Sequence, residues 1–92
     1  MKTINNGKHY NSDKCERLAE RNHYNNGNYA GTTYIVRASD GQLLILCDSN
    51  GQDCYYTNDF YAPYEEIDFD GYDMDEVQLA RCVELGLITN ID

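Results

Sequence analysis

Short apolar runs alternate with polar, glycine-containing pairs through the middle of the chain. The pairs Asp40-Gly41 and Asn50-Gly51 favour tight turns. The runs on either side of them, at residues 32–37, 42–47 and 54–57, are rich in β-branched, aliphatic and aromatic residues. This pattern predicts a three-stranded antiparallel meander. The middle run is apolar on both faces, which is typical of the central strand of a small sheet.

A helical spacing precedes the meander. Residues 13–22 follow the capping residues Asn11 and Ser12, and their few apolar side chains recur three and four residues apart. These side chains are Cys15, Leu18 and Ala19. We expect a short N-terminal helix here, after a tight turn at Asn5-Asn6-Gly7, and a loop over residues 23–31, which are rich in Asn and Gly.

The last part of the chain predicts a second helix. Asp73 is followed three residues later by Glu76, which resembles a capping box, and Gly86 suits the position just past a helix end. Apolar residues recur between them at helical spacing. The whole chain, residues 1–92, then predicts one α+β domain. It would contain an N-terminal helix, a three-stranded antiparallel meander with a possible extra edge strand, and a C-terminal helix packed on the sheet.

Charge is distributed unevenly along these 92 residues. The net charge is −9, but residues 1–46 carry a net +2 and residues 47–92 a net −11. Nucleic acid and anionic membranes would repel the second half, so we expect no direct binding to either. The asymmetry favours a protein partner with positive potential.

Most of the negative charge lies in one stretch, which we call the acidic cluster. It contains eight acidic residues and no basic residue between positions 59 and 76: Asp59, Glu65, Glu66, Asp68, Asp70, Asp73, Asp75 and Glu76. Five of the nine tyrosines lie in or just before it: Tyr55, Tyr56, Tyr61, Tyr64 and Tyr72. Tyrosine is a common interface anchor and stacks against arginine. We therefore predict a partner-binding surface formed by the eight acids together with Tyr61, Tyr64 and Tyr72.

The spacing of the acidic cluster can be compared with that of DNA. In an extended chain Glu66, Asp68 and Asp70 would share one face about 6.6 Å apart, with Ile67 and Phe69 pointing inward. One strand of duplex DNA carries a charge about every 3.4 Å. A DNA-like density therefore needs a second row of carboxylates. The candidates are Asp53 and Asp59 near the third strand, and the first turn of the last helix.

Two other interpretations of the acidic cluster remain open. It could be a solvated surface that keeps a small protein soluble, with part of it stabilising the N-terminus of the last helix. It could also bind calcium weakly, because residues 66–71 match the first six positions of an EF-hand loop. The match ends there: Val77 occupies the position of the bidentate glutamate, and Pro63 lies where a helix should enter. We expect no metal site and no cofactor.

No catalytic motif occurs in the sequence, so we expect a binding protein rather than an enzyme. The only histidines, His9 and His23, flank Cys15, and surface histidines beside a structural cysteine explain this better than a catalytic pair. The four cysteines form no CxxC motif and are expected to be free thiols, although Cys47 and Cys54 flank a predicted turn and could pair. The N-terminus lacks a signal-peptide pattern and no apolar stretch could span a membrane, so we expect a cytoplasmic protein.

Two resemblances bear on function. The segment from Asn6 to Ser12 (NGKHYNS), the strand containing Tyr34 and Arg37, and the following hairpin resemble small orphan proteins of bacterial mobile elements that begin NGKxYDT. Asn11 and Cys15 stand where that set has Asp and Ala. This resemblance implies no activity.

The second resemblance is one of kind. Small size, strong acidity and interleaved tyrosines are similar to the phage-encoded anti-CRISPR and anti-restriction proteins that imitate DNA. This resemblance implies an inhibitor, without catalysis, that occupies the basic DNA-recognition cleft of a CRISPR effector or another basic nucleic-acid-binding protein in a bacterial host. The alternative belongs to another class: a non-inhibitory interaction module, such as an antitoxin-like or regulatory subunit bound to a basic partner. A homodimer is also possible, because the apolar run at residues 42–47 could be covered by a second copy.

Overall fold

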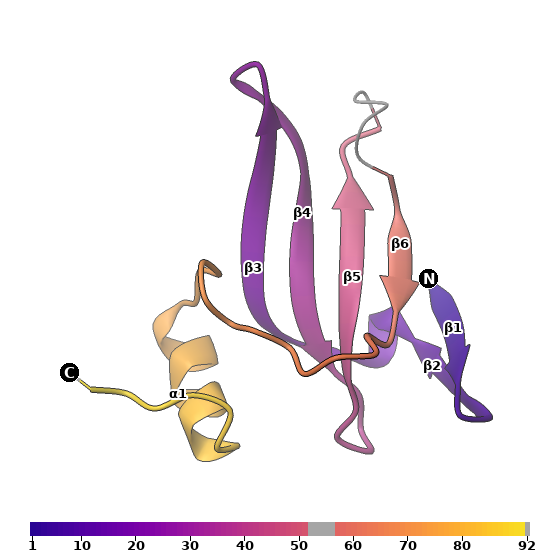
Figure 1. The fold of residues 1–92 in the computed structure, drawn as a ribbon, viewed down its shortest axis with the longest axis vertical. Coiled ribbons are helices and arrows are strands. Elements are labelled where there is room, and N and C mark those ends of the chain that lie inside the picture. The colour runs from indigo at the N-terminus through magenta and orange to yellow at the C-terminus, as the bar shows by residue number, and fades with distance from the viewer. Residues whose placement is uncertain (52–56, 92) are drawn as a thin grey trace.

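The structure is a computed structural model that describes residues 1–51 and 57–91. These residues form a small α+β domain dominated by strands, with two sheets and one α-helix (Figure 1). The elements in chain order are β1 (Lys2–Asn5), β2 (Lys8–Asn11), the 3-10 helix η1 (Ser12–Lys14), β3 (Glu16–Asn25), β4 (Asn28–Arg37), β5 (Leu43–Ser49), β6 (Asp59–Tyr61) and α1 (Glu76–Glu84). No helix among the described residues is long and apolar enough to cross a membrane.

Both sheets are antiparallel and join strands that are neighbours in sequence. Strands β1 and β2 form a two-stranded hairpin. Strands β3, β4, β5 and β6 form a four-stranded meander in that order, with Ile35 opposite Ile45 and Leu46 opposite Phe60. The connections are short, and every neighbouring pair of strands follows directly in the chain.

The prediction of an N-terminal helix over residues 13–22 was wrong. Asn11 does cap a turn, since its side chain accepts a hydrogen bond from the Asp13 N–H at 3.0 Å. Only the single 3-10 turn η1 follows, and Cys15 is already extended. The chain then continues as β3, which pairs with β4 over almost its whole length.

A β-bulge explains why this strand has a helical spacing. The pairing of β3 with β4 shifts register between Arg17 and Ala19, so Leu18 is the extra residue. Leu18 and Ala19 are consecutive and both fully buried, whereas a regular strand would place them on opposite faces. Together with the half-buried Cys15 they occupy positions i, i+3 and i+4, which is also the pattern of a helix face.

The predicted loop over residues 23–31 was also wrong. These residues continue β3, turn at Asn26-Gly27 and begin β4. Asn26 and Gly27 have φ values of 53° and 80°, which suit a two-residue hairpin turn of type I′. The turn predicted at Asn6-Gly7 is confirmed and has the same geometry, with φ values of 52° and 74°.

The sheet has four strands rather than the three that the sequence predicts. The third predicted strand, residues 54–57, lies largely outside the described residues, and Thr57 is not in a strand. The strand that pairs with β5 in the structure is β6, which begins at Asp59. The fourth strand is β3, the segment that the sequence assigned to a helix.

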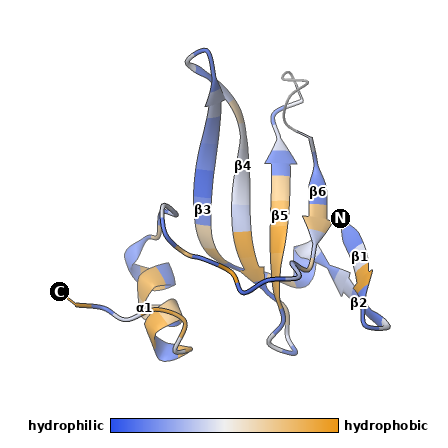
Figure 2. Ribbon diagram, viewed as in Figure 1, coloured by the Kyte–Doolittle hydropathy of each residue, from blue (hydrophilic) through white to orange (hydrophobic). Residues whose placement is uncertain are grey.

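The lower half of the four-stranded sheet holds the core, and its two faces bury different groups (Figure 2). On one face the N-terminal hairpin contributes Tyr10 to a cluster of buried side chains: Tyr10, Val36, Ala38, Leu44, Leu46 and Phe60. On the other face Ala19, Ile35 and Ile45 form a smaller cluster. The smaller cluster is covered by residues of the segment between β6 and α1, which carries most of the acidic cluster.

The N-cap of α1 lies two residues later than predicted. It is Asp75, whose side chain accepts from the Gln78 N–H at 2.7 Å, while the Gln78 side chain accepts from the Asp75 N–H. The predicted pair of Asp73 and Glu76 does not form this box. The predicted end of the helix is confirmed, because Gly86 has a φ of 73° and its N–H donates to the carbonyl of Val83.

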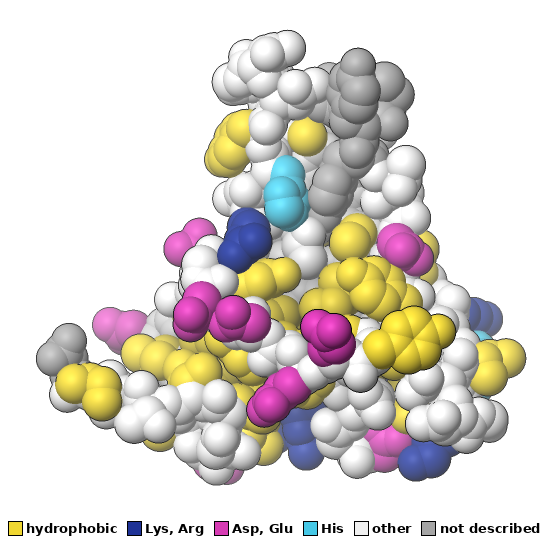
Figure 3. Space-filling view, in the orientation of Figure 1, with side chains coloured by type: hydrophobic (Ala, Val, Ile, Leu, Met, Phe, Trp, Pro, Cys, Tyr) yellow, Lys and Arg dark blue, Asp and Glu magenta, His cyan; other side chains and the backbone are white. Residues whose placement is uncertain are grey.

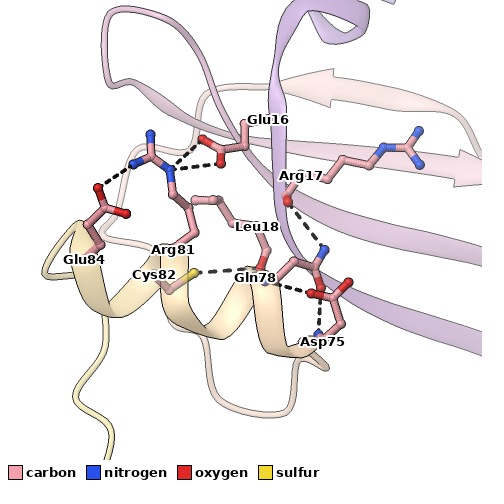
Figure 4. Close-up of polar contacts among 8 residues, drawn as sticks. All are labelled: Glu16, Arg17, Leu18, Asp75, Gln78, Arg81, Cys82 and Glu84. Atoms are coloured by element: carbon pink, nitrogen blue, oxygen red, sulfur yellow. Dashed lines mark hydrogen bonds and ion pairs between the residues drawn. The ribbon is translucent and has the colours of Figure 1, made fainter.

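Side-chain contacts hold α1 against the first residues of β3 (Figure 4). Gln78 Nε2 donates to the carbonyl of Arg17 at 3.4 Å, and the Cys82 thiol donates to the carbonyl of Leu18 at 3.8 Å. Arg81 forms an ion pair with Glu16 at 3.0 Å. A nine-residue helix is too short to be stable alone in water, so this contact with β3 maintains it.

Candidate acidic binding surface

Residues 62–75, which we call the crossing segment, connect β6 to α1 across one face of the sheet (Figure 1). The segment passes over β5 and β4 to reach the outer edge of β3. Four of its side chains point inward onto the cluster of Ala19, Ile35 and Ile45: Ile67, Phe69, Tyr72 and Met74. The expected inward position of Ile67 and Phe69 is confirmed.

The acidic side chains of the crossing segment point the other way. All eight members of the acidic cluster are exposed. Glu66, Asp68 and Asp70 alternate with the half-buried Ile67 and Phe69, so these three share the outer face. Figure 3 shows acidic side chains spread across the lower half of this face, over the crossing segment.

Backbone pairing fixes the far end of the crossing segment to the sheet. Asp73 forms an isolated antiparallel bridge with Glu20 of β3, through hydrogen bonds of 3.0 Å and 2.7 Å between their backbones. A tight turn precedes this bridge, in which the Tyr72 N–H donates to the carbonyl of Phe69 at 3.1 Å. Gly71 in that turn has a φ of 80°, a conformation that other residues adopt at a cost.

Arg21 of β3 holds the same turn without neutralising a carboxylate. Its guanidinium donates to the backbone carbonyl of Asp70 at 2.9 Å and to that of Gly71 at 3.3 Å. It also lies over the ring of Tyr72, 4.6 Å from the centroid. No pattern in the sequence indicates this contact, because Arg21 falls in the segment predicted as a helix and lies about fifty positions from the turn.

No basic side chain in the described part of the chain forms an ion pair with the acidic cluster. The ion pairs among the described residues involve Asp40, Glu16 and Glu84, none of which belongs to it. Three members accept one hydrogen bond each from a backbone N–H: Asp59 from Phe60, Asp68 from Asp70, and Asp75 from Gln78. Glu65, Glu66, Asp70, Asp73 and Glu76 accept no side-chain hydrogen bond from the described part of the chain. Local structure therefore explains three of the eight carboxylates and leaves five available to a partner.

The tyrosines predicted as anchors differ in exposure. Tyr64 is completely exposed, with a relative accessibility of 108%, and Tyr61 on β6 is exposed at 39%. Tyr72 is half-buried beneath Arg21, and burial raises the pKa of its hydroxyl while Arg21 opposes the rise. Tyr64 and Tyr61 are thus the rings that a partner can reach most easily. Tyr55 and Tyr56 lie outside the described residues.

The acidic cluster extends over three parts of the chain. Six of its carboxylates belong to the crossing segment, Asp59 is the first residue of β6, and Glu76 is the first residue of α1. Alternate residues of an extended chain are about 6.6 Å apart, roughly twice the spacing of phosphates along one DNA strand. Of the residues expected to form a second row, Asp59 lies on β6 and Glu76 on α1, and Asp53 lies outside the described residues.

A shallow groove of about 250 Å³ opens beside Glu65 and Glu66. It lies between the turn that joins β4 to β5 and the start of the crossing segment, and is lined by Gly41, Gln42, Leu43, Pro63, Glu65, Glu66 and Ile67. The groove combines an apolar floor with two carboxylates. This suits a long cationic side chain, whose methylene groups pack on apolar atoms while its charged end contacts the acids.

Other candidate chemistry has weaker support in the structure. No three His, Cys, Asp or Glu side chains in the described residues are grouped so that they could hold a metal ion, which leaves the calcium alternative without a site there. His9 and Cys15 line one small cavity of about 210 Å³, but burial raises the pKa of the Cys15 thiol, which donates to the carbonyl of Asn11. A protonated thiol is a poor nucleophile.

The cysteines are free where the structure describes them. Cys15, Cys47 and Cys82 are unpaired thiols, and Cys54, the expected partner of Cys47, lies outside the described residues. Burial raises the pKa of Cys82, as it does that of Cys15. Both thiols therefore stay protonated at neutral pH and pack as small apolar groups.

The comparisons with known proteins add no further assignment. The chain matches no protein-family model, no curated protein and no solved structure.

Proposed function

We propose that this protein inhibits a nucleic-acid-binding protein by occupying its basic cleft with the acidic cluster. One observation carries the proposal: five exposed carboxylates that follow one another along the crossing segment and into α1 have no basic partner among the described residues. A stable protein normally intersperses charges of both signs on its surface. A series of unpaired carboxylates supports a surface whose counter-charges are supplied by a partner.

The groove beside Glu65 and Glu66 indicates which side chain the receptor would place there. An arginine of the receptor would place its methylene groups against Leu43 and Pro63, and its guanidinium on the carboxylates. The exposed ring of Tyr64 supplies a stacking surface for a second arginine. Basic nucleic-acid-binding clefts present such arginines to phosphates and base edges.

The class of receptor comes from the resemblance and not from the geometry. The acidic, tyrosine-containing surface is similar in kind to phage-encoded DNA mimics, so the proposed receptor is a CRISPR effector in the cytoplasm of a bacterial host. Free thiols at Cys15, Cys47 and Cys82 are consistent with a reducing compartment. The spacing expected for Glu66, Asp68 and Asp70 in an extended chain is sparser than that of phosphates along a DNA strand. It supports contact with a few receptor arginines more than replacement of a whole duplex.

DNA cleavage by purified CRISPR effectors, assayed with and without the protein, tests the proposal. The informative variant is Glu66→Lys with Asp70→Lys, because both side chains are exposed and neither carboxylate accepts a hydrogen bond in the described structure. The matched control is Asp13→Lys with Asp48→Lys, which changes the net charge equally at exposed positions outside the acidic cluster. We expect the wild type and the control to inhibit and the first variant to lose inhibition.

Two results would contradict the proposal. Equal inhibition by both variants would show that the acidic cluster is not the contact surface. If the protein inhibits none of the effector types tested, a CRISPR effector is rejected as the receptor. Restriction endonucleases, included in the same experiment, would then test the anti-restriction alternative.

A further inference from the structure

Helix α1 leaves an apolar ridge uncovered on the side that faces away from β3. Gln78, Arg81 and Cys82 contact β3, whereas Val77, Ala80 and Val83 lie on other faces of the helix and are exposed. Val77 is 78% exposed and Val83 is 40% exposed. Figure 3 shows hydrophobic side chains at the surface on the side of the molecule where α1 lies.

Shallow grooves run along both sides of this ridge. One, of about 460 Å³, is lined by Glu76, Leu79, Ala80, Val83, Glu84 and Asn90. The other, of about 410 Å³, is lined by Glu16, Glu76, Val77, Ala80, Arg81 and Glu84. Both grooves therefore have apolar centres, and acidic side chains border them.

The charges around the ridge identify the occupant. Three carboxylates, from Glu16, Glu76 and Glu84, border the grooves together with one cation, Arg81, which pairs with Glu16 and Glu84. Glu76 has no ion-pair partner among the described residues. The border thus carries a net negative charge, which attracts a basic partner.

A second copy of this chain fits the ridge poorly. Two α1 helices packed antiparallel about Ala80 would bring Glu76 of one copy next to Glu84 of the other at both ends. These contacts repel, and each chain already carries a net charge of −9.

We propose that the ridge of α1 binds an amphipathic helix of a protein partner, with an apolar stripe flanked by lysine or arginine. The apolar stripe would cover Val77, Ala80 and Val83, and the basic residues would contact Glu76 and the bordering acids. A nine-residue helix is only about 13.5 Å long, so the ridge is smaller than the roughly 800 Å² per partner of a stable interface. It acts as an apolar anchor inside a larger contact, and the acidic cluster, which ends at Glu76, adjoins it.

A defined peptide probe tests the proposal without knowledge of the partner. The probe is a synthetic amphipathic helix of leucine and lysine, compared with a peptide of the same composition in which the apolar stripe is scrambled. Binding is measured by fluorescence anisotropy at 0.15 M NaCl. Val77→Ser is compared with Ile4→Ser, because Ile4 on β1 is exposed to a similar degree, 72%, and lies far from α1 in the sequence.

We expect the amphipathic peptide to bind the wild type and Ile4→Ser within a factor of about 2, and Val77→Ser about tenfold more weakly. The scrambled peptide should bind all three proteins weakly and equally. Equal affinity of Val77→Ser and Ile4→Ser for the amphipathic peptide would overturn the proposal, because charge alone would then hold the probe. A wild-type dimer that becomes a monomer in Val77→Ser, measured by sedimentation, would also overturn it, since a second copy would be the occupant.

The test is independent of the CRISPR assay. Loss of inhibition in Glu66→Lys with Asp70→Lys concerns the crossing segment, whereas peptide binding to Val77→Ser concerns α1. Either proposal can fail while the other stands.

Discussion

Arg21 determines how the acidic cluster is displayed. A carboxylate would be the expected partner of an arginine in so acidic a region, yet Arg21 donates to the backbone carbonyls of Asp70 and Gly71. Its charge is thereby used to hold the turn, and the neighbouring carboxylates stay exposed. The position of one guanidinium thus separates the folding role of the crossing segment from its proposed binding role.

Gly71→Ala should destabilise the protein by more than the cost of placing alanine in a left-handed backbone conformation. A Cβ at Gly71 would overlap Arg21 Nη2, and the φ of 80° adds the cost of a left-handed conformation. We expect a loss of about 1–2 kcal/mol for the conformation and the displaced hydrogen bonds together. Chemical denaturation measures the loss.

Gly27→Ala is the matched control for that change. Gly27 has the same φ of 80°, but a Cβ there would meet no atom within 4 Å, so only the conformational cost of about 1 kcal/mol applies. Equal losses in the two variants would show that the contact with Arg21 adds no stability.

Asp40 gives the stability a defined pH dependence. The Gln42 N–H, the Tyr10 hydroxyl and Lys8 all hydrogen-bond to its carboxylate and lower its pKa. A carboxyl with a pKa lower in the folded than in the unfolded state stabilises the fold above the unfolded value, about 3.9, and loses this contribution as the pH falls through the folded value. The wild type should therefore be more stable than Asp40→Asn at pH 7. The difference should begin to shrink below about pH 4 and should disappear once the pH is below the lowered pKa of Asp40 in the folded protein.

Thermal melting of both proteins between pH 2.5 and 7 measures this difference. A gap between the two melting temperatures that stays constant over the whole range would show that the charge of Asp40 does not stabilise the fold.

At the scale of elements, the sequence predicted the features that depend on neighbouring residues. The turn at Asn6-Gly7, the alternation of Ile67 and Phe69 with acids, and the Gly86 end of α1 all follow from local patterns. The strand β3 did not, because its bulge at Leu18 buries two consecutive residues and imitates a helix face. The contact of Arg21 with Gly71 joins residues fifty positions apart, and no local pattern encodes it.

The N-cap of α1 offers a direct test at this scale. Asp75→Ala should remove the hydrogen bond to the Gln78 N–H and cost about 1 kcal/mol, or roughly 4–8 °C in melting temperature. Asp73→Ala removes an equal charge two residues earlier. The Asp73 side chain accepts no hydrogen bond from the described residues, and its backbone bridge to Glu20 remains.

We therefore expect Asp73→Ala to melt close to the wild type. Circular dichroism at 222 nm follows α1 in both variants. A larger loss in Asp73→Ala than in Asp75→Ala would support the cap that the sequence suggested in place of the one in the structure.

At the scale of the whole molecule, the acidic cluster should lower the stability of the free protein. Alternate residues of an extended chain, as expected for Glu66, Asp68 and Asp70, are about 6.6 Å apart. This is well inside the Debye length of about 30 Å at 0.01 M salt and beyond that of about 3 Å at 1 M. The described ion pairs are few and at least partly exposed, so screening by salt weakens little stabilising attraction between opposite charges. The melting temperature should therefore rise with NaCl.

Glu66→Gln with Asp70→Asn should raise the melting temperature at 0.01 M salt by roughly 2–4 °C and reduce its salt dependence. Both changes keep the size of the side chain, and Asp68, which caps the turn, stays intact. A melting temperature that is independent of salt, or that falls with it, would show that the carboxylates do not repel one another appreciably.

The route of the crossing segment also determines when one face of the sheet can be covered during protein synthesis. Ile35 and Ile45 belong to strands that leave the ribosome early, but the side chains that cover them, from Ile67 to Met74, are translated some twenty to forty residues later. At translation speeds of about 5–20 residues per second, this face of the nascent sheet stays open to water and to chaperones for seconds. Closure of the domain waits for the last quarter of the chain.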